Sequence, residues 1–147
     1  MKDVFFHFFI SYYIIKEKED FMREKLEKLL ENCYAKYSDY QVSAICVMND
    51  RKEFSGVNVE NASYGATICA ERVAITKAIS EGYKKGDFKE LHVMVNSEKL
   101  GSPCFICRQV ISELLNQDVD VVMYSKISEL TLKVADLCPY PFGEDNL

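Results

Sequence analysis

Three cysteines in two short stretches of the chain could hold a metal ion. Cys69 and Glu71 lie in the stretch TICAER, and Cys104 and Cys107 lie 35 or more positions later in PCFIC. A structural zinc site normally has four protein ligands, whereas a hydrolytic site has three and leaves the fourth position to water. Three thiols with a carboxylate close to the first therefore indicate a zinc site for hydrolysis, with Glu71 as a proton carrier.

Both stretches are expected at helix starts. Thr67 can cap a helix that runs to about Glu81, and Pro103 can start another that reaches about Asn116. Residues two apart point to nearly opposite sides of a helix, but at a helix start Cys69 and Glu71 can share one pocket. Three thiolates and one Zn²⁺ carry a net negative charge, which the positive ends of two helices and a nearby arginine, Arg72 or Arg108, would offset.

Two other uses of these cysteines stay open at this point. A Cys-x-x-Cys pair alone is often a redox pair or half of a structural zinc site. Cys138 could also serve as a fourth ligand and close the site. Its place in a Pro-containing tail, 31 positions after Cys107 and without a paired ligand, disfavours that reading.

The composition is that of one globular domain in 147 residues, 48% of them apolar and 28% charged. The net charge of −5 disfavours DNA or RNA as the main partner. Six cysteines are too few for a small disulfide scaffold, and nothing marks the chain as secreted. We therefore expect a cytoplasmic protein without a membrane or nucleic-acid partner.

The N-terminal segment 4–15 (VFFHFFISYYII) is apolar and aromatic. Twelve residues are too few to cross a bilayer as a helix, and no small-residue cleavage site follows them. Residues 1–20 are therefore predicted to be an N-terminal extension, and residues 21–147 the domain. Two interpretations of the extension stay open: a segment that packs on the domain or stays loose, or a native start at Met22.

Periodicity and turn residues predict the order α-β-β-α-β-α-β-β. A hairpin followed by alternating strands and helices favours a mixed sheet with helices on both faces. The expected helices cover residues 21–34, 67–81 and 103–116; the expected strands cover 41–48, 53–59, 89–96, 119–124 and 130–133, with a loop at 60–66.

Four motifs in order resemble the small homotetrameric zinc-dependent cytidine deaminases of pyrimidine salvage. They are YSxYxV (37–42), GxNVENASY (56–64), CAER (69–72) and CxxCRQV (104–110), and the resemblance covers about residues 22–142. It implies a three-layer α/β/α sandwich with a five-stranded mixed sheet, one zinc per subunit and a homotetramer. It also implies hydrolytic deamination of cytidine and deoxycytidine to uridine and deoxyuridine, with release of ammonia.

The resemblance also implies a role for particular residues. Glu71 would carry protons from water to ring N3 and to the departing amine. Two ribose contacts would come from Asn58 and Glu60, and Tyr40 would lie against the base. The remaining assignments are Cys69, Cys104 and Cys107 as zinc ligands, Ala70 N–H on the pyrimidine O2, the Ser102 carbonyl near the leaving amine, Ala62, Tyr64 and Phe142 in a neighbouring subunit's pocket, and Arg72 on the ligand thiolates.

Three departures from the family pattern stand out. Ser43 replaces a glycine, Tyr40 replaces a phenylalanine and adds a hydroxyl, and Phe105 replaces a glycine between the cysteines. A glycine there can allow a special backbone angle, and Phe105 is expected to affect pocket shape through its bulk. The alternatives are a blasticidin-type aminonucleoside deaminase, which would lack the motif at Asn58, and a non-catalytic zinc-stabilised domain, which would have no use for Glu71.

Overall fold

The structure is a computed structural model that describes the backbone of residues 2–147 and the side chains of residues 16–147. The chain forms one five-stranded sheet with the order β2-β1-β3-β4-β5. The β3–β4 pair is parallel and the other neighbouring pairs are antiparallel, so the sheet is mixed, as predicted. The strands are β1 (Val42–Met48), β2 (Glu53–Val57), β3 (Phe88–Val95), β4 (Asp120–Tyr124) and β5 (Glu129–Lys133).

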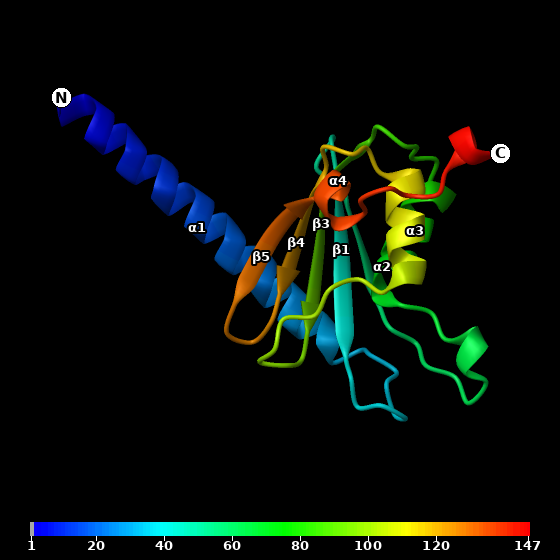
Figure 1. Cartoon of the computed structure of the whole chain (residues 1–147). Helices are drawn as coiled ribbons and strands as arrows, with labels where there is room; N and C mark the ends of the chain where they lie inside the picture. The colour runs from blue at the N-terminus through cyan, green and yellow to red at the C-terminus, as the bar shows by residue number, and fades with distance from the viewer. Residues whose placement is uncertain (1) are drawn as a thin grey trace.

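Helices cover both faces of this sheet (Figure 1). The first face carries α1 (Lys2–Leu30), and the other carries α2 (Ala70–Ser80), α3 (Phe105–Leu114) and the short α4 (Val134–Leu137). Successive side chains of β1 explain both layers, because they point to opposite faces of the strand. Ile45 and Val47 join the cluster under α1, while Ala44 and Cys46 join the cluster under α2. The predicted three-layer α/β/α sandwich is confirmed.

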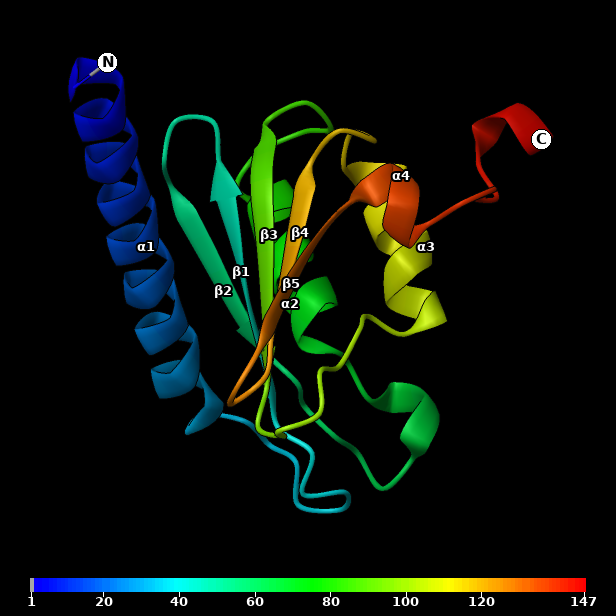
Figure 2. The ribbon, with the colours of Figure 1, turned by 60° about the vertical axis from the view of Figure 1, so that its left-hand side comes forward.

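The first helix is longer than the predicted 21–34. It begins at Lys2, passes the expected boundary at residue 20 and ends at Leu30. No Pro or Gly interrupts residues 2–30, so Asp20 lies inside the helix and does not cap it. The first turns project past the sheet, as Figures 1 and 2 both show.

The status of the N-terminal extension remains a prediction. How the side chains of residues 4–15 pack lies outside the described residues. Among the helices that the structure describes, none combines the length and apolar character needed to cross a membrane.

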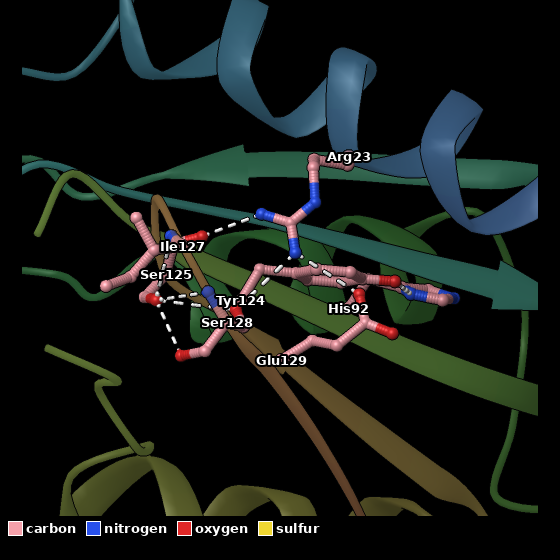
Figure 3. A network of polar contacts seen from close by, with 7 residues as sticks. All are labelled: Arg23, His92, Tyr124, Ser125, Ile127, Ser128 and Glu129. Atoms are coloured by element: carbon pink, nitrogen blue, oxygen red, sulfur yellow. Dashed lines mark hydrogen bonds and ion pairs between the residues drawn. The ribbon is translucent and has the colours of Figure 1, made fainter. Parts of the chain in front are cut away.

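Arg23 fixes α1 to the turn between β4 and β5 (Figure 3). Its guanidinium donates to the carbonyl oxygen of Ser125 at 2.7 Å and pairs with Glu129 at 3.2 Å. The same group lies 5.0 Å from the ring centroid of Tyr124, whose hydroxyl is 3.1 Å from Nδ1 of His92. This layer is therefore held by a partly buried polar network as well as by apolar contacts.

Candidate zinc centre and nucleoside pocket

The three predicted ligands converge where α2 and α3 begin. Cys69 is the N-cap of α2 and Cys104 the N-cap of α3, while Cys107 lies one turn into α3. The three sulfur atoms all lie within 4.8 Å of one another, and those of Cys69 and Cys104 are 3.9 Å apart. This is the geometry of one metal held by three thiolates at two positive helix ends.

The two predicted helix starts were each wrong by two residues. Cys69 and not Thr67 is the N-cap of α2, and α3 begins at Phe105 and not at Pro103. The Thr67 hydroxyl instead accepts a hydrogen bond from the backbone N–H of Asn61. Residues 67 and 68 stay extended because Ile68 pairs with Val59 in an isolated bridge. The shift moves Cys69 to the last non-helical position, from which its side chain can reach α3 without competing with Glu71 for one helix face.

Arg72 lies beside the sulfur cluster. Its Nη2 donates to the Thr67 carbonyl oxygen at 2.9 Å. Among the described side chains, its Nε is the buried nitrogen or oxygen atom that has no hydrogen-bond partner. A hydrogen bond with the Cys107 thiol is the main cause that lowers the pKa of Cys69 to about 5, and the nearby positive charge of Arg72 acts in the same direction. An orphaned donor next to a readily ionised thiol fits a site built for metal-bound thiolates.

Cys138 does not close the site. Its sulfur donates to the carbonyl oxygen of Arg108 at 3.5 Å, and it is not part of the three-sulfur group. The described donor set therefore has three members, as a hydrolytic zinc site requires.

Glu71 is buried at the first turn of α2, with 4% of its surface exposed. Burial raises its pKa to about 6, and the negative charge of Cys69 acts in the same direction. A carboxyl group that titrates close to neutral pH can both accept and release a proton, which is what a shuttle needs.

A cavity of about 240 Å³ lies in front of this carboxylate. Polar side chains, two of the thiols and apolar side chains from β1 and β3 line it together. The lining residues are Ser38, Tyr40, Val42, Asn58, Glu60, Thr67, Cys69, Glu71, Val93, Val95, Gly101, Ser102 and Cys104. The cavity thus brings together Tyr40, Asn58, Glu60 and Ser102 with the metal-site residues, as the sequence predicted.

Asn58 and Glu60 also organise the backbone around the cavity. The amide of Asn58 accepts from the N–H of Val42 at 3.0 Å and donates to the carbonyl of Tyr40 at 2.8 Å. The carboxylate of Glu60 accepts from the Ser38 hydroxyl and from two backbone N–H groups, which lowers its pKa. An ionised Glu60 is a strong acceptor for a sugar hydroxyl.

Tyr40 and Gly101 meet at the wall of the cavity. A Cβ atom on Gly101 would lie 2.5 Å from the Tyr40 hydroxyl and 2.7 Å from Cγ1 of Val95. Only a glycine therefore fits beside the additional hydroxyl that Tyr40 brings. This partner residue was missed at the sequence level, because an isolated glycine in a loop predicts a turn and not a close approach.

Four other predicted residues do not line this cavity. Ala70 is fully buried at the start of α2, whereas Ala62, Tyr64 and Phe142 are exposed on the surface. Tyr64 packs edge-on against Tyr37, and the carbonyl oxygen of Phe142 accepts a hydrogen bond from the side chain of Gln109 on α3. The three exposed residues are available to a neighbouring subunit, and their assignment to its pocket stays a prediction.

Phe105 lies outside the cavity, against the expectation that its bulk would affect pocket shape. It is the first residue of α3, its φ is not positive, and its side chain is 83% exposed. The ring lies 5.0 Å from the guanidinium carbon of Arg108. No special backbone angle is needed at this position, so a side chain is tolerated there.

Comparison with known proteins gives the family. Residues 15–124 match the model of the cytidine and deoxycytidylate deaminase zinc-binding region. The chain belongs to this family. The family's zinc-binding region contains the three-thiol cluster, and zinc is the metal of this site.

Two relatives show how much of the chain this family membership covers. A cytidine deaminase of Halalkalibacterium halodurans is 39% identical over 120 residues, covering 80% of this chain and 88% of the relative. A probable cytidine deaminase of Dictyostelium discoideum is 43% identical over 133 residues, covering 85% and 88%. The family resemblance expected from the four motifs is confirmed.

Solved structures of the family share the fold. The crystal structure of a cytidine deaminase from Burkholderia pseudomallei superposes with a TM-score of 0.77 at 39% identity, covering 81% of this chain and 94% of that one. The structure of the Mycobacterium tuberculosis cytidine deaminase gives a TM-score of 0.70 at 28% identity, with 82% and 94% covered. The α/β fold class is therefore shown by sequence and by structure.

Proposed function

We propose that the chain catalyses zinc-dependent hydrolytic deamination of cytidine and deoxycytidine to uridine and deoxyuridine, with release of ammonia, in pyrimidine salvage. One observation carries the proposal: a single cavity is lined by two thiols of the metal cluster, by the buried Glu71, and by Asn58 and Glu60. The family comparisons agree with this activity, because the relatives are named cytidine deaminases. A non-catalytic zinc domain would have no use for a carboxylate buried beside the metal.

The proposed mechanism depends on the position of Glu71. Cys69, Cys104 and Cys107 would hold the zinc, which would supply a Lewis acid that makes water a nucleophile near neutral pH. Glu71 accepts one proton from the attacking water and delivers it to ring N3 while the water oxygen bonds to C4. Glu71 then takes the second proton from that oxygen and carries it to the amine, whose bond to C4 breaks to release ammonia and leave the C4 carbonyl. A raised pKa suits both steps, since the carboxyl group has to gain and lose protons in each cycle.

The cavity residues hold the substrate in place for this proton transfer. Glu60 and Asn58 bind the ribose hydroxyls, Tyr40 lies against the base, and the Ser102 carbonyl accepts from the leaving amine. Ala70 does not line the cavity, and its N–H is assigned to the pyrimidine O2 from the family resemblance alone. Orientation of this kind supplies a large part of catalysis, because the reacting atoms meet without further loss of freedom.

We further propose a homotetramer with one zinc per subunit, in which Ala62, Tyr64 and Phe142 contact a neighbour's substrate. Their exposure supports this proposal, since none of the three packs into the cavity of its own chain. A cytoplasmic location also stays a prediction, and the six free cysteines are consistent with it. Mass photometry of the purified protein tests the assembly.

The activity is tested with cytidine absorbance and two variants. Glu71→Gln should retain about one zinc per chain and lose activity by about 100- to 10,000-fold, the range of general acid–base catalysis. Glu60→Ala should impair turnover of the nucleosides more than zinc content, because Glu60 lines the cavity but is not part of the three-thiol group. Equal rates for wild type and Glu71→Gln would remove Glu71 from the mechanism, and a wild type inactive on cytidine and deoxycytidine would reject the proposed activity.

A further inference from the structure

The side chain of Arg108, on α3, joins three segments of the chain. Its Nε donates to the carbonyl oxygen of Pro103 at 2.9 Å, and its Nη2 donates to the hydroxyl oxygen of Ser102 at 3.0 Å. Its Nη1 donates to the carbonyl oxygen of Leu137 at 2.9 Å, where α4 ends. The planar guanidinium can serve three acceptors in fixed directions, which a lysine cannot do.

These bonds are the principal anchor of the segment before Cys104. Residues 100–103 have no regular secondary structure. Within the described part of the chain, the hydrogen bonds that reach these four residues all come from the Arg108 side chain. The segment also packs closely on the cavity wall, because Gly101 leaves no space for a Cβ atom beside Tyr40. A small displacement of this segment would therefore move Ser102 and Tyr40, which both line the cavity.

The guanidinium also contacts an exposed ring, and its bond to Leu137 satisfies the end of a helix. The ring of Phe105 lies 5.0 Å from its central carbon, and the Leu137 carbonyl is one of the unpaired groups at the end of α4. The neighbouring Gln109 donates to the carbonyl oxygen of Phe142 at 2.9 Å and so fixes the tail on α3. α3 thus contacts the cavity segment through Arg108 and the tail through Gln109.

We propose that Arg108 is a positioning residue that sets Ser102 and Pro103 at the rim of the cavity and ties them to the C-terminal tail. Arg108 does not line the cavity, so it acts through Ser102. The proposal rests on the proposed deaminase function, in which the Ser102 carbonyl meets the departing amine. Since that contact matters most in the transition state, loss of Arg108 should lower kcat more than it raises KM.

The test compares Arg108→Gln and Arg108→Lys with Phe105→Ala as a matched control. Displacement of the reacting groups by about 1 Å costs about 100-fold, so both Arg108 variants should lose about 10- to 100-fold in kcat with KM within about 3-fold. Phe105→Ala removes the stacked ring and leaves the three hydrogen bonds, and its kcat should stay within about 3-fold. Zinc content and melting temperature are measured for every variant, and rates are expressed per bound zinc.

Chemical rescue separates positioning from a general loss of structure. Added guanidinium ion should restore several-fold activity to Arg108→Ala, whereas the same concentration of ammonium ion should not. Wild-type kcat in Arg108→Lys, loss of zinc in Arg108→Gln, or a Phe105→Ala loss as large as that of Arg108→Gln would overturn the proposal. An inactive wild type would instead reject the proposed function, so the two failures are distinguishable.

Discussion

Gly56 of β2 lies against the backbone of the catalytic helix α2, and Gly56→Ala should impair both folding and catalysis. An added Cβ atom would lie 2.4 Å from the carbonyl oxygen of Ala70 and 2.6 Å from the backbone nitrogen of Ala74. Ordinary contacts begin at 3.4 Å, so the start of α2 would have to retreat by about 1 Å. Both atoms belong to the helix backbone, and no side-chain rotation can relieve the overlap.

The size of the effect follows from this displacement. Overpacking of a close contact costs about 1–3 kcal/mol, which should lower the melting temperature by about 3–10 °C in a domain of this length. Glu71 follows Ala70 directly, and a 1 Å displacement of a reacting group costs about 100-fold in rate. We therefore expect a loss of about 100-fold in kcat/KM for cytidine, even when zinc is saturating.

The assay pairs thermal unfolding with initial rates of cytidine deamination. Gly143→Ala is the control, because no atom lies within 4 Å of the position that its Cβ would take. The control should match the wild type in melting temperature and rate. A Gly56→Ala protein with unchanged melting temperature and unchanged kcat would refute the close approach of β2 and α2 as a determinant of the site.

Three other predictions concern single side chains. Arg23→Gln removes a charge-assisted hydrogen bond to a buried carbonyl and should lower the free energy of unfolding by about 1–2 kcal/mol in urea titrations; no change would show that this bond does not contribute to holding α1. The hydrogen bond from His92 is the main cause that lowers the pKa of Glu90 from 4.5 to about 2, so its stabilisation is present above pH 4.5 and lost as the pH falls towards 2. Glu90→Gln should therefore lower the free energy of unfolding by about 1 kcal/mol at pH 7 after solvent screening, and urea titrations should show the difference from the wild type closing below pH 4.5; a difference that stays constant would contradict an ionised Glu90 as its source. Cys138→Ser should retain one zinc per chain by metal analysis, whereas loss of zinc would make Cys138 a ligand.

The element order and the chemical groups of the site could be predicted from the sequence. Strand alternation in β1 and the turn residues around it predict the strands of the sheet, and the spacing of Cys69, Cys104 and Cys107 predicts the three-thiol metal site. These are local signals, because side-chain type and periodicity are carried by neighbouring residues. The family resemblance then supplied the sugar-binding end of the cavity.

The helix boundaries that were wrongly predicted depend on information that local residue types do not carry. Thr67 is a good cap by residue type, but pairing of Ile68 with Val59 holds that stretch extended and delays the helix to Ala70. The length of α1 was underestimated because Asp20 resembles a cap although the helix continues through it. The short α4 was missed because four residues carry too little periodicity to be detected.

Because Cys69 caps α2, Cys104 caps α3 and Cys107 lies in the first turn of α3, a shared zinc ion would act as a removable cross-link between the two helices. It closes a loop of about 35 residues that includes β3, the strand between the two helices. By the chain-entropy relation used for disulfides, such a link lowers the conformational entropy of the unfolded chain and so stabilises the folded state by about 4 kcal/mol. Loss of zinc would then lower the stability of the folded protein as well as its activity.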